Sequence, residues 1–447
     1  MKIRPSAIRI SMISLGCPKT LVDSEVILGK LADARYRLEV DPASSDVVLL
    51  NTCGFIKEAK QESIDAILKL IELKKTKNNL GLVVVGCLVQ RYADELKKEF
   101  PEIDAFLGSG DYEKIVATIR AVADGKKVVS VRRAGYLAGV DEPRVPLTPK
   151  FYRYLKISEG CDHTCSFCVI PALRGRFRSR SVPDVVEEAR ILVRQGAKEL
   201  VLIGQDITKF GCDHAKKPLL PRLLRELENI EGLHWVRLLY AYPSSLTDET
   251  VQMMASSSKI CHYLDLPLQH ISDRILTAMR RGCDKERTIS LIRRLRVAIP
   301  DIVLRTSLIV GFPGETEQEF RELLDFMEEV KFERLGIFMF SPEEGSPAAV
   351  MPHQIPEKIK KERHHRAMRI QQRISGEVQQ RTVGQTLEVL VESKDSMMLD
   401  RWVGRTERDA PEVDGRVLVR SSRPLRPGTF YKARVTGADA YDLLAEI

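Results

Sequence analysis

Six of the nine cysteines in this sequence fall into two sets whose spacing suits metal chemistry. The compact set is Cys161, Cys165 and Cys168, within the string SEGCDHTCSFCVIP. A four-iron cluster normally takes four thiolates, and this set supplies three. We therefore expect a cluster with one iron left open to an exogenous ligand, as a catalytic metal site keeps one position free.

The second set repeats one local pattern at wide intervals. Cys17 ends ISLGC, Cys53 ends VLLNTC and Cys87 ends VVVGC, with spacings of 36 and 34 residues. Each spacing is close to one βαβ unit, and ligands of parallel sheets gather at the carboxyl ends of strands. We expect these thiolates to converge on one edge and to form a second three-cysteine cluster. The other three cysteines do not repeat at the end of successive apolar runs, and we expect them to be structural: Cys212, Cys261 and Cys283.

Two other interpretations of the compact set stay open. Its thiols could be buried apolar filler, or His163 could complete a Cys3His zinc site, although usual zinc spacings pair their ligands differently. A disulfide framework is not expected, because the cysteine number is odd and nothing in the sequence indicates secretion.

Hydrophobic periodicity indicates which elements position the cysteines. From residue 7 to 125, short runs of Val, Ile and Leu alternate with helical patterns, which predicts a Rossmann-like parallel sheet that carries the dispersed cysteine set. The expected strands are 8–15, 46–50 and 80–85, and the expected helices are 24–31, 56–73 and 92–99.

Residues 147–378 show six strand candidates with helical stretches between them. This predicts a partial (β/α)6 barrel, since a full eightfold barrel takes about 250 residues. The turn GFPGET also suits a helix start, with Thr316 as its N-cap. The expected strands are 152–157, 199–203, 235–240, 262–266, 302–309 and 335–340.

Residues 381–447 contain five short runs separated by glycine turns, which predicts a small antiparallel β-barrel. We expect this domain to help hold a protein substrate, because its acidic run Glu407–Asp414 suits a basic partner. An RNA-reading β domain would instead present a basic groove with stacking aromatics. The only aromatic residues here are Trp402, Phe430, Tyr431 and Tyr441.

The overall composition is that of a globular protein, with 44% hydrophobic and 30% charged residues. No apolar run is long enough for a membrane-spanning helix, and the N-terminus lacks the apolar stretch of a signal peptide, so we expect a cytoplasmic protein. The net charge of +8 is spread along the chain, so it permits RNA contact without requiring it.

The compact motif, with Phe167 just before its last cysteine, resembles the radical S-adenosylmethionine (SAM) enzymes. A three-cysteine domain in front of the barrel and a small TRAM-like β domain behind it are similar to the layout of the methylthiotransferases. Three strings resemble the RimO-type branch, which modifies a ribosomal-protein aspartate: SLGCPKTLVDSE at Ser14–Glu25, NTCGFIKEAKQESI at Asn51–Ile64 and DAPEVDG at Asp409–Gly415.

The resemblance implies two [4Fe-4S] clusters, one on each cysteine set, and SAM bound to the open iron of the compact one. SAM cleavage would produce a radical that removes hydrogen from an unactivated carbon, and the other cluster would carry the transferred sulfur. It also implies an electron donor such as a flavodoxin or ferredoxin, and a sulfur donor. Further SAM contacts are expected at Phe167, Gln205, Asp206, Gln269 and Arg305.

The resemblance makes the substrate an aspartate of a small-subunit ribosomal protein, free or assembled in the ribosome. A related branch modifies an adenosine in tRNA, but it typically has Gln where this chain has Pro18, and a small residue followed by Val-Arg where this chain has Gly54-Phe55. A third hypothesis is a non-catalytic metal-binding scaffold on the ribosome.

Overall fold

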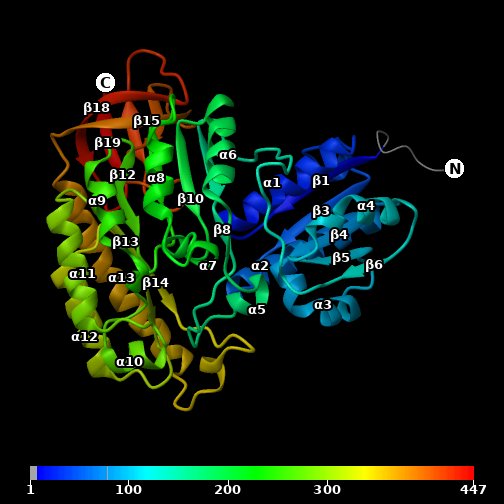
Figure 1. Ribbon diagram of the computed structural model, residues 1–447, viewed down its shortest axis with the longest axis horizontal. Helices are drawn as coiled ribbons and strands as arrows, with labels where there is room; N and C mark the ends of the chain where they lie inside the picture. The colour runs from blue at the N-terminus through cyan, green and yellow to red at the C-terminus, as the bar shows by residue number, and fades with distance from the viewer. Residues whose placement is uncertain (1–7, 78) are drawn as a thin grey trace.

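The N-terminal region forms a six-stranded parallel sheet in the computed structural model, which describes residues 8–77 and 79–447. The expectation about a signal peptide in residues 1–7 therefore lies outside the described residues. The strand order is β2-β1-β3-β4-β5-β6 (Figure 1). The bounds are β1 Arg9–Ser14, α1 Pro18–Asp33, β2 Arg37–Leu38, β3 Val47–Thr52, α2 Lys57–Thr76, β4 Gly81–Gly86, α3 Cys87–Glu99, β5 Ala105–Gly108, α4 Ile115–Ala123 and β6 Val128–Ser130.

Helices cover both faces of this sheet, because apolar side chains alternate along its fully buried strands. Val47 and Leu49 of β3 pack with α1 and α4, whereas Val48 and Leu50 pack with α2 and α3. The strand order reverses between β1 and β3, which makes this the topological switch point of a doubly wound sheet. The predicted Rossmann-like domain is confirmed, and the pattern missed only the short strands β2, β5 and β6 and the helix α4.

The central region is an incomplete barrel whose six parallel strands follow the order β14-β13-β12-β11-β10-β7. The predicted partial barrel is confirmed, and every predicted strand overlaps an observed one. The strand bounds are β7 Tyr152–Lys156, β8 Ser158–Glu159, β9 Arg178–Ser179, β10 Glu199–Ile203, β11 Trp235–Leu238, β12 Ile260–Asp265, β13 Val303–Val310 and β14 Arg334–Met339. The helix bounds are α5 Ile170–Arg174, α6 Val182–Arg194, α7 Cys212–Ala215, α8 Leu220–Glu228, α9 Asp248–Ser256, α10 Asp273–Ala278, α11 Lys285–Ala298 and α12 Glu317–Val330.

The long helix α13 Glu357–Gln380 leads into a closed five-stranded barrel in the order β15-β16-β17-β19-β18. Four of its neighbouring pairs are antiparallel, but β17 and β19 pair in parallel, which the predicted antiparallel barrel did not include. None of the helices in the described ranges has the length and apolar content that a bilayer crossing requires. The strand bounds are β15 Thr386–Lys394, β16 Arg401–Arg405, β17 Val417–Arg420, β18 Thr429–Ala438 and β19 Leu443–Glu446.

One apolar cluster inside the central barrel draws on all three regions. Val22 of α1 joins it from the N-terminal region, and Leu390 and Ala410 join it from the C-terminal region. The remaining members line the barrel, among them Tyr154 and Tyr263. Because the barrel interior is completed by its neighbours, the three regions form one structural unit.

The N-cap of α12 shows how local sequence determines where a helix of the barrel begins. Thr316 Oγ accepts from the Glu319 N–H, and the Glu319 carboxylate accepts from the Thr316 N–H, which completes a capping box as the turn sequence predicted. We expect Thr316→Ala to cost about 1 kcal/mol. The apparent melting temperature should fall by about 1 °C, whereas Thr316→Ser should keep it, and an unchanged value for the alanine variant would contradict the cap.

Candidate active site

The three dispersed cysteines converge at the carboxyl edge of the N-terminal sheet. Cys17 follows β1 and Cys53 follows β3, so they lie on the two sides of the switch point, and Cys87 follows β4. Gly16, at φ +98°, leaves no room for a side chain, since a Cβ there would lie 3.0 Å from the Cys53 Cβ. A Cβ on Gly54 would lie 2.8 Å from the Cys87 carbonyl oxygen. Glycine beside the cysteines therefore lets the three loops meet.

The thiols of this set act on one another. Burial, together with Cys53 and Cys17, raises the pKa of Cys87 to about 12, although Arg174 acts to lower it. Burial also raises the pKa of Cys53. For Cys17, burial is outweighed by Lys19, Thr20 and Arg174, so its pKa is lowered. Since metals bind the thiolate, cluster assembly here must release the proton that burial holds on Cys87.

The compact cysteines lie in the loop between β8 and α5, at the carboxyl end of the first barrel strand. The Cys168 N–H donates to the Cys165 carbonyl, and the Cys161 N–H donates to the Gly175 carbonyl. Burial raises the pKa of Cys161 to about 11 and that of Cys168 to about 12. Neighbouring cysteines of the set contribute to both values, so the three thiols share one pocket.

His163 has another role than the one a Cys3His zinc site would give it. Its Nε2 is hydrogen-bonded to Asp206 Oδ2 at 2.7 Å, and its ring stacks on Tyr242 with centroids 3.6 Å apart. Arg281 Nη1 donates to Cys165 Sγ at 3.4 Å and lies over the same tyrosine ring. These contacts fix the cluster loop against the barrel wall.

A buried network of charges joins the two cysteine sets. Lys156 pairs with Asp23 of α1 and with Glu159 of β8, and Arg174 of α5 pairs with the same two carboxylates. All four side chains are at most 4% exposed. Burial works to raise the pKa of Glu159, but the two cations outweigh it and hold the pKa at about 2. Arg174 Nε also donates to Cys87 Sγ at 3.2 Å.

Two of the expected SAM contacts lie at the barrel mouth beside the cluster loop. Gln205 Nε2 donates to Glu159, while Gln205 Oε1 is buried and has no hydrogen-bond partner among residues 8–77 and 79–447. Ser158 Oγ is also buried and has no hydrogen-bond partner in the described ranges. Phe167 packs on the apolar cluster that contains Ile275 and Met279.

The other expected contacts already have protein partners. Asp206 accepts from the Thr208 N–H as well as pairing with His163. Arg305 Nη1 donates to Asp265 at 2.7 Å, inside the barrel. Gln269 has the unusual φ of +78° and pairs through its backbone with β13, so the backbone is strained at this position of the mouth. The roles of all five residues toward SAM stay predictions.

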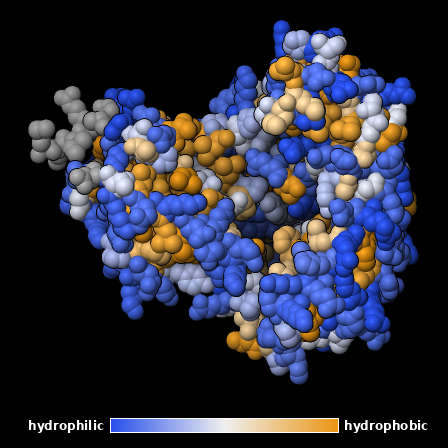
Figure 2. All heavy atoms as spheres, turned by 180° about the vertical axis from the view of Figure 1, so that it is seen from behind, coloured by the Kyte–Doolittle hydropathy of each residue, from blue (hydrophilic) through white to orange (hydrophobic). Residues whose placement is uncertain are grey.

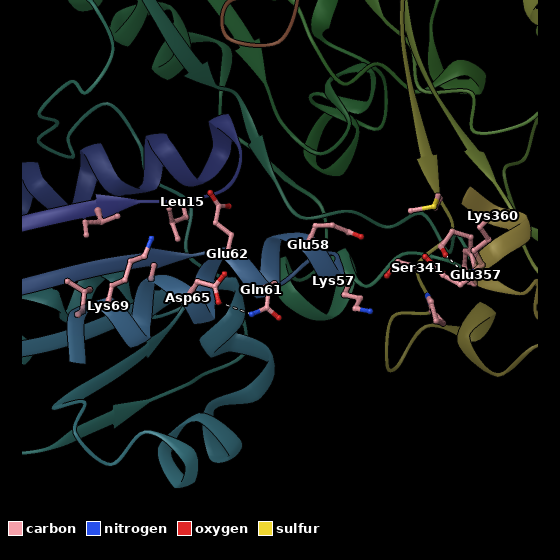
Figure 3. Close-up of a pocket in the computed structure, with 16 residues that line it drawn as sticks. Leu15, Lys57, Glu58, Gln61, Glu62, Asp65, Lys69, Ser341, Glu357 and Lys360 are labelled. Carbon is pink, nitrogen blue, oxygen red and sulfur yellow. Dashed lines mark hydrogen bonds between the residues drawn. The ribbon is translucent and has the colours of Figure 1, made fainter. Parts of the chain in front are cut away.

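A cleft of about 930 Å³ opens beside the auxiliary set, which is the name used below for Cys17, Cys53 and Cys87. One wall is α2 and the end of β1, and the other is the end of β14 with the start of α13 (Figure 3). Leu15, two residues before Cys17, lines this cleft together with Glu62 of α2. From behind, a hollow lies between the N-terminal domain and the rest of the molecule (Figure 2).

The interpretation of Glu407–Asp414 as a surface for a basic partner is wrong for its two aspartates. Asp409 is 2% exposed and pairs with Arg334, and Asp414 accepts from the Tyr263 hydroxyl. Both partners lie inside the barrel, where β14 begins and where β12 runs. The acidic run closes the amino end of the barrel, and its two aspartates pair with Arg334 and Arg305 within the chain.

The surroundings of the thiols fit iron–sulfur clusters, because buried polar groups near them have no hydrogen-bond partner in the described part of the chain. The Tyr112 hydroxyl is buried without a partner in the described part of the chain, and Cys87 and Arg174 both act on its pKa, which burial raises. Gln205 Oε1 is similarly free beside the compact set. No described group of three ligands suits a single metal ion. A four-iron cluster needs wider spacing, because each thiolate binds a different iron.

Comparison with known proteins identifies the three regions. Residues 9–108 match the uncharacterized protein family UPF0004, residues 155–327 the radical SAM superfamily and residues 383–447 the TRAM domain. The ribosomal protein uS12 methylthiotransferase RimO of Pelotomaculum thermopropionicum is 48% identical over 98% of this chain and 99% of its own length. RimO of Geobacter sulfurreducens is 47% identical over 98% of both chains.

The chain belongs to the RimO family of radical SAM methylthiotransferases. Membership carries two cofactors, SAM and [4Fe-4S] clusters, and confirms the family resemblance of the cysteine motifs. Among solved structures, the radical SAM methyltransferase TsrM from Kitasatospora setae aligns with a TM-score of 0.57 at 16% identity, covering 82% of this chain and 89% of that one. At that identity the likeness shows the fold alone.

Sequence reasoning missed the residues that hold the RimO-family site together. They are charged side chains beside the motif or within apolar strands: Lys19, Asp23, Lys156, Glu159, Arg174 and Arg281. A signal was present for Lys156, because a charge inside an apolar strand run needs a buried partner. The partner itself comes from a segment 133 residues away, so the pattern could not identify it.

We expect the two cysteine sets to bind iron independently. Anaerobically reconstituted protein should contain about eight irons per chain if both sites fill with four-iron clusters. Replacing Cys161, Cys165 and Cys168 by Ala should halve the iron and abolish SAM cleavage. Replacing Cys17, Cys53 and Cys87 should halve the iron but preserve SAM cleavage. Stoichiometric zinc without visible absorption would contradict both assignments.

The closure of the barrel by the C-terminal domain gives a second test. Asp409→Ala leaves buried Arg334 without its nearest carboxylate, so we expect a loss of about 3 kcal/mol in stability. Asp400→Ala is the matched control, since Asp400 and Arg420 form an exposed pair that contributes at most about 1 kcal/mol. Equal thermal unfolding of the two variants would contradict the buried closure.

Proposed function

We propose that this RimO-family enzyme transfers a methylthio group to the β-carbon of an aspartate in ribosomal protein uS12. The observation that carries the proposal is that two three-cysteine sets meet at the two ends of α5, where the Ile170 N–H donates to Cys168 and Arg174 donates to Cys87. Sequence identity of 45–49% over nearly the whole chain to relatives named uS12 methylthiotransferases supports the substrate.

When bound, the clusters and SAM supply the radical and sulfur chemistry that no side chain can perform. The chain's own residues orient and shield it. Glu159 and Gln205 offer acceptors to an ammonium group beside Cys161. Val22 and Tyr240 extend apolar surface from α1 to the end of β11, which excludes water from the space between the cysteine sets.

The cleft between α2 and β14 gives a protein loop access to the auxiliary set. The α2 wall presents Glu58, Glu62 and Asp65, one helical turn apart, and none forms an ion pair within the described ranges. These unpaired carboxylates, which Lys57 and Lys69 flank on the same wall, suit a basic ribosomal protein. The same proposal includes an electron donor such as a flavodoxin or ferredoxin, a separate sulfur donor and, since ribosomal proteins are the substrate, a cytoplasmic location.

The tRNA alternative finds less support in the C-terminal domain. Three of its four aromatic residues are used in packing: Trp402 is 8% exposed, Phe430 stacks on His234 and Tyr431 packs against the domain core. Only Tyr441, at 46% exposure, faces solvent. A single exposed ring does not form the stacking platform that RNA-reading β domains use.

Mass spectrometry of ribosomal proteins and tRNA from cells with and without this gene tests the function. We expect uS12 to gain the mass of a methylthio group only when the gene is present, on a peptide that contains an aspartate. A methylthio group on tRNA adenosine with unmodified uS12 would contradict the substrate. The variant with Cys161, Cys165 and Cys168 replaced by Ala is the control, since it should not restore the modification.

A further inference from the structure

The short helix α5 connects the two cysteine sets directly. At its start, the Ile170 N–H donates to Cys168 Sγ at 3.4 Å. At its end, Arg174 Nε donates to Cys87 Sγ at 3.2 Å. Five helical residues advance by about 8 Å, so ligands of the two sets lie at the two ends of one rigid element. Cys87 and Arg174 come from different domains.

Arg174 is held in one orientation by its other contacts. Its Nη1 donates to Asp23 Oδ2 at 2.5 Å and to Glu159 Oε2 at 3.4 Å. The side chain is 4% exposed and α5 ends at this residue. Because the guanidinium is planar and fixed at Nη1, the Nε–H must point toward Cys87.

A permanent cation that donates to a ligand sulfur favours the more negative state of an iron–sulfur cluster. Hydrogen bonds to the sulfurs, net charge and solvent exposure set the reduction potential of such clusters. Arginine keeps its charge at all relevant pH values, and this site is closed to water. The positive charge of Arg174 and its hydrogen bond to Cys87 act in the same direction, and both stabilise the reduced cluster.

We propose that Arg174 is a positioning residue that raises the reduction potential of the auxiliary cluster through its hydrogen bond to Cys87. The proposal rests on the assignment of the auxiliary set as cluster ligands in the proposed function. It assigns α5 a role beyond the fold: the helix fixes the compact loop at one end and adjusts the auxiliary centre at the other. The cysteine motifs alone assign no role to Arg174.

Potentiometric titration of the reconstituted protein, followed by electron paramagnetic resonance, tests this proposal. The auxiliary signal is assigned in the variant with Cys161, Cys165 and Cys168 replaced by Ala. Arg174→Gln removes the charge and the Nε–H that donates to Cys87, and we expect its auxiliary potential to fall by at least 59 mV, a tenfold change in the one-electron equilibrium. Arg174→Lys keeps the charge, so the potential of its auxiliary cluster should fall by less. The potential of the compact cluster should stay unchanged.

Arg144→Lys is the matched control. Arg144 is also a buried arginine that ties α1 to the barrel domain, through Glu25 and Glu188, but it touches no cysteine. It should leave both potentials unchanged. An equal shift in Arg144→Lys would overturn the proposal, because the effect would then come from the domain interface.

The remaining outcomes are also decisive. Unchanged auxiliary potentials in both Arg174 variants at full iron content would overturn the proposal, as would loss of auxiliary iron from both, which would make Arg174 a retention residue. The titration needs no substrate, so a failure to modify uS12 would disprove the proposed function without affecting this result.

Discussion

The buried group of two cations and two carboxylates at the junction of α1, β7 and α5 decides where the chemistry takes place. Lys156 and Arg174 come from the barrel domain, Glu159 precedes the compact cysteine loop, and Asp23 follows Cys17 on α1. Such groups add little net stability, but removing one member leaves an uncompensated buried charge. The network therefore selects one alignment of the two domains, which is the alignment in which Arg174 of the barrel domain reaches Cys87 of the N-terminal domain.

That alignment brings together two general properties of parallel sheets. The auxiliary set occupies the switch point of the N-terminal sheet, and the compact set follows the first strand of the barrel. Both cysteine sets lie at the carboxyl edges of parallel sheets. Helix α1 begins directly after Cys17 and pairs with the barrel domain through Asp23. The C-terminal domain closes the opposite end of the barrel through Asp409 and Asp414, so the mouth stays available to substrate.

The sequence predicted all three domains and most strands, because periodicity is strong where strands are buried on both faces. It also grouped the six cysteines, since spacing and strand phase are local properties. It misassigned the run Glu407–Asp414, because a carboxylate that pairs with Arg334 looks in sequence like one that faces solvent. It missed Arg174 for a related reason: the contact with Cys87 joins residues 87 positions apart, and only the packed domains create it.

The central claim is that the two clusters lie at the two ends of α5. Electron paramagnetic resonance of the fully reduced protein tests it most directly. Two paramagnetic centres separated by one short helix interact magnetically. The account predicts a spectrum that differs from the sum of the spectra of the two single-cluster cysteine variants, with line broadening from spin coupling. A spectrum equal to that sum would show that the clusters are magnetically isolated, and would contradict the account.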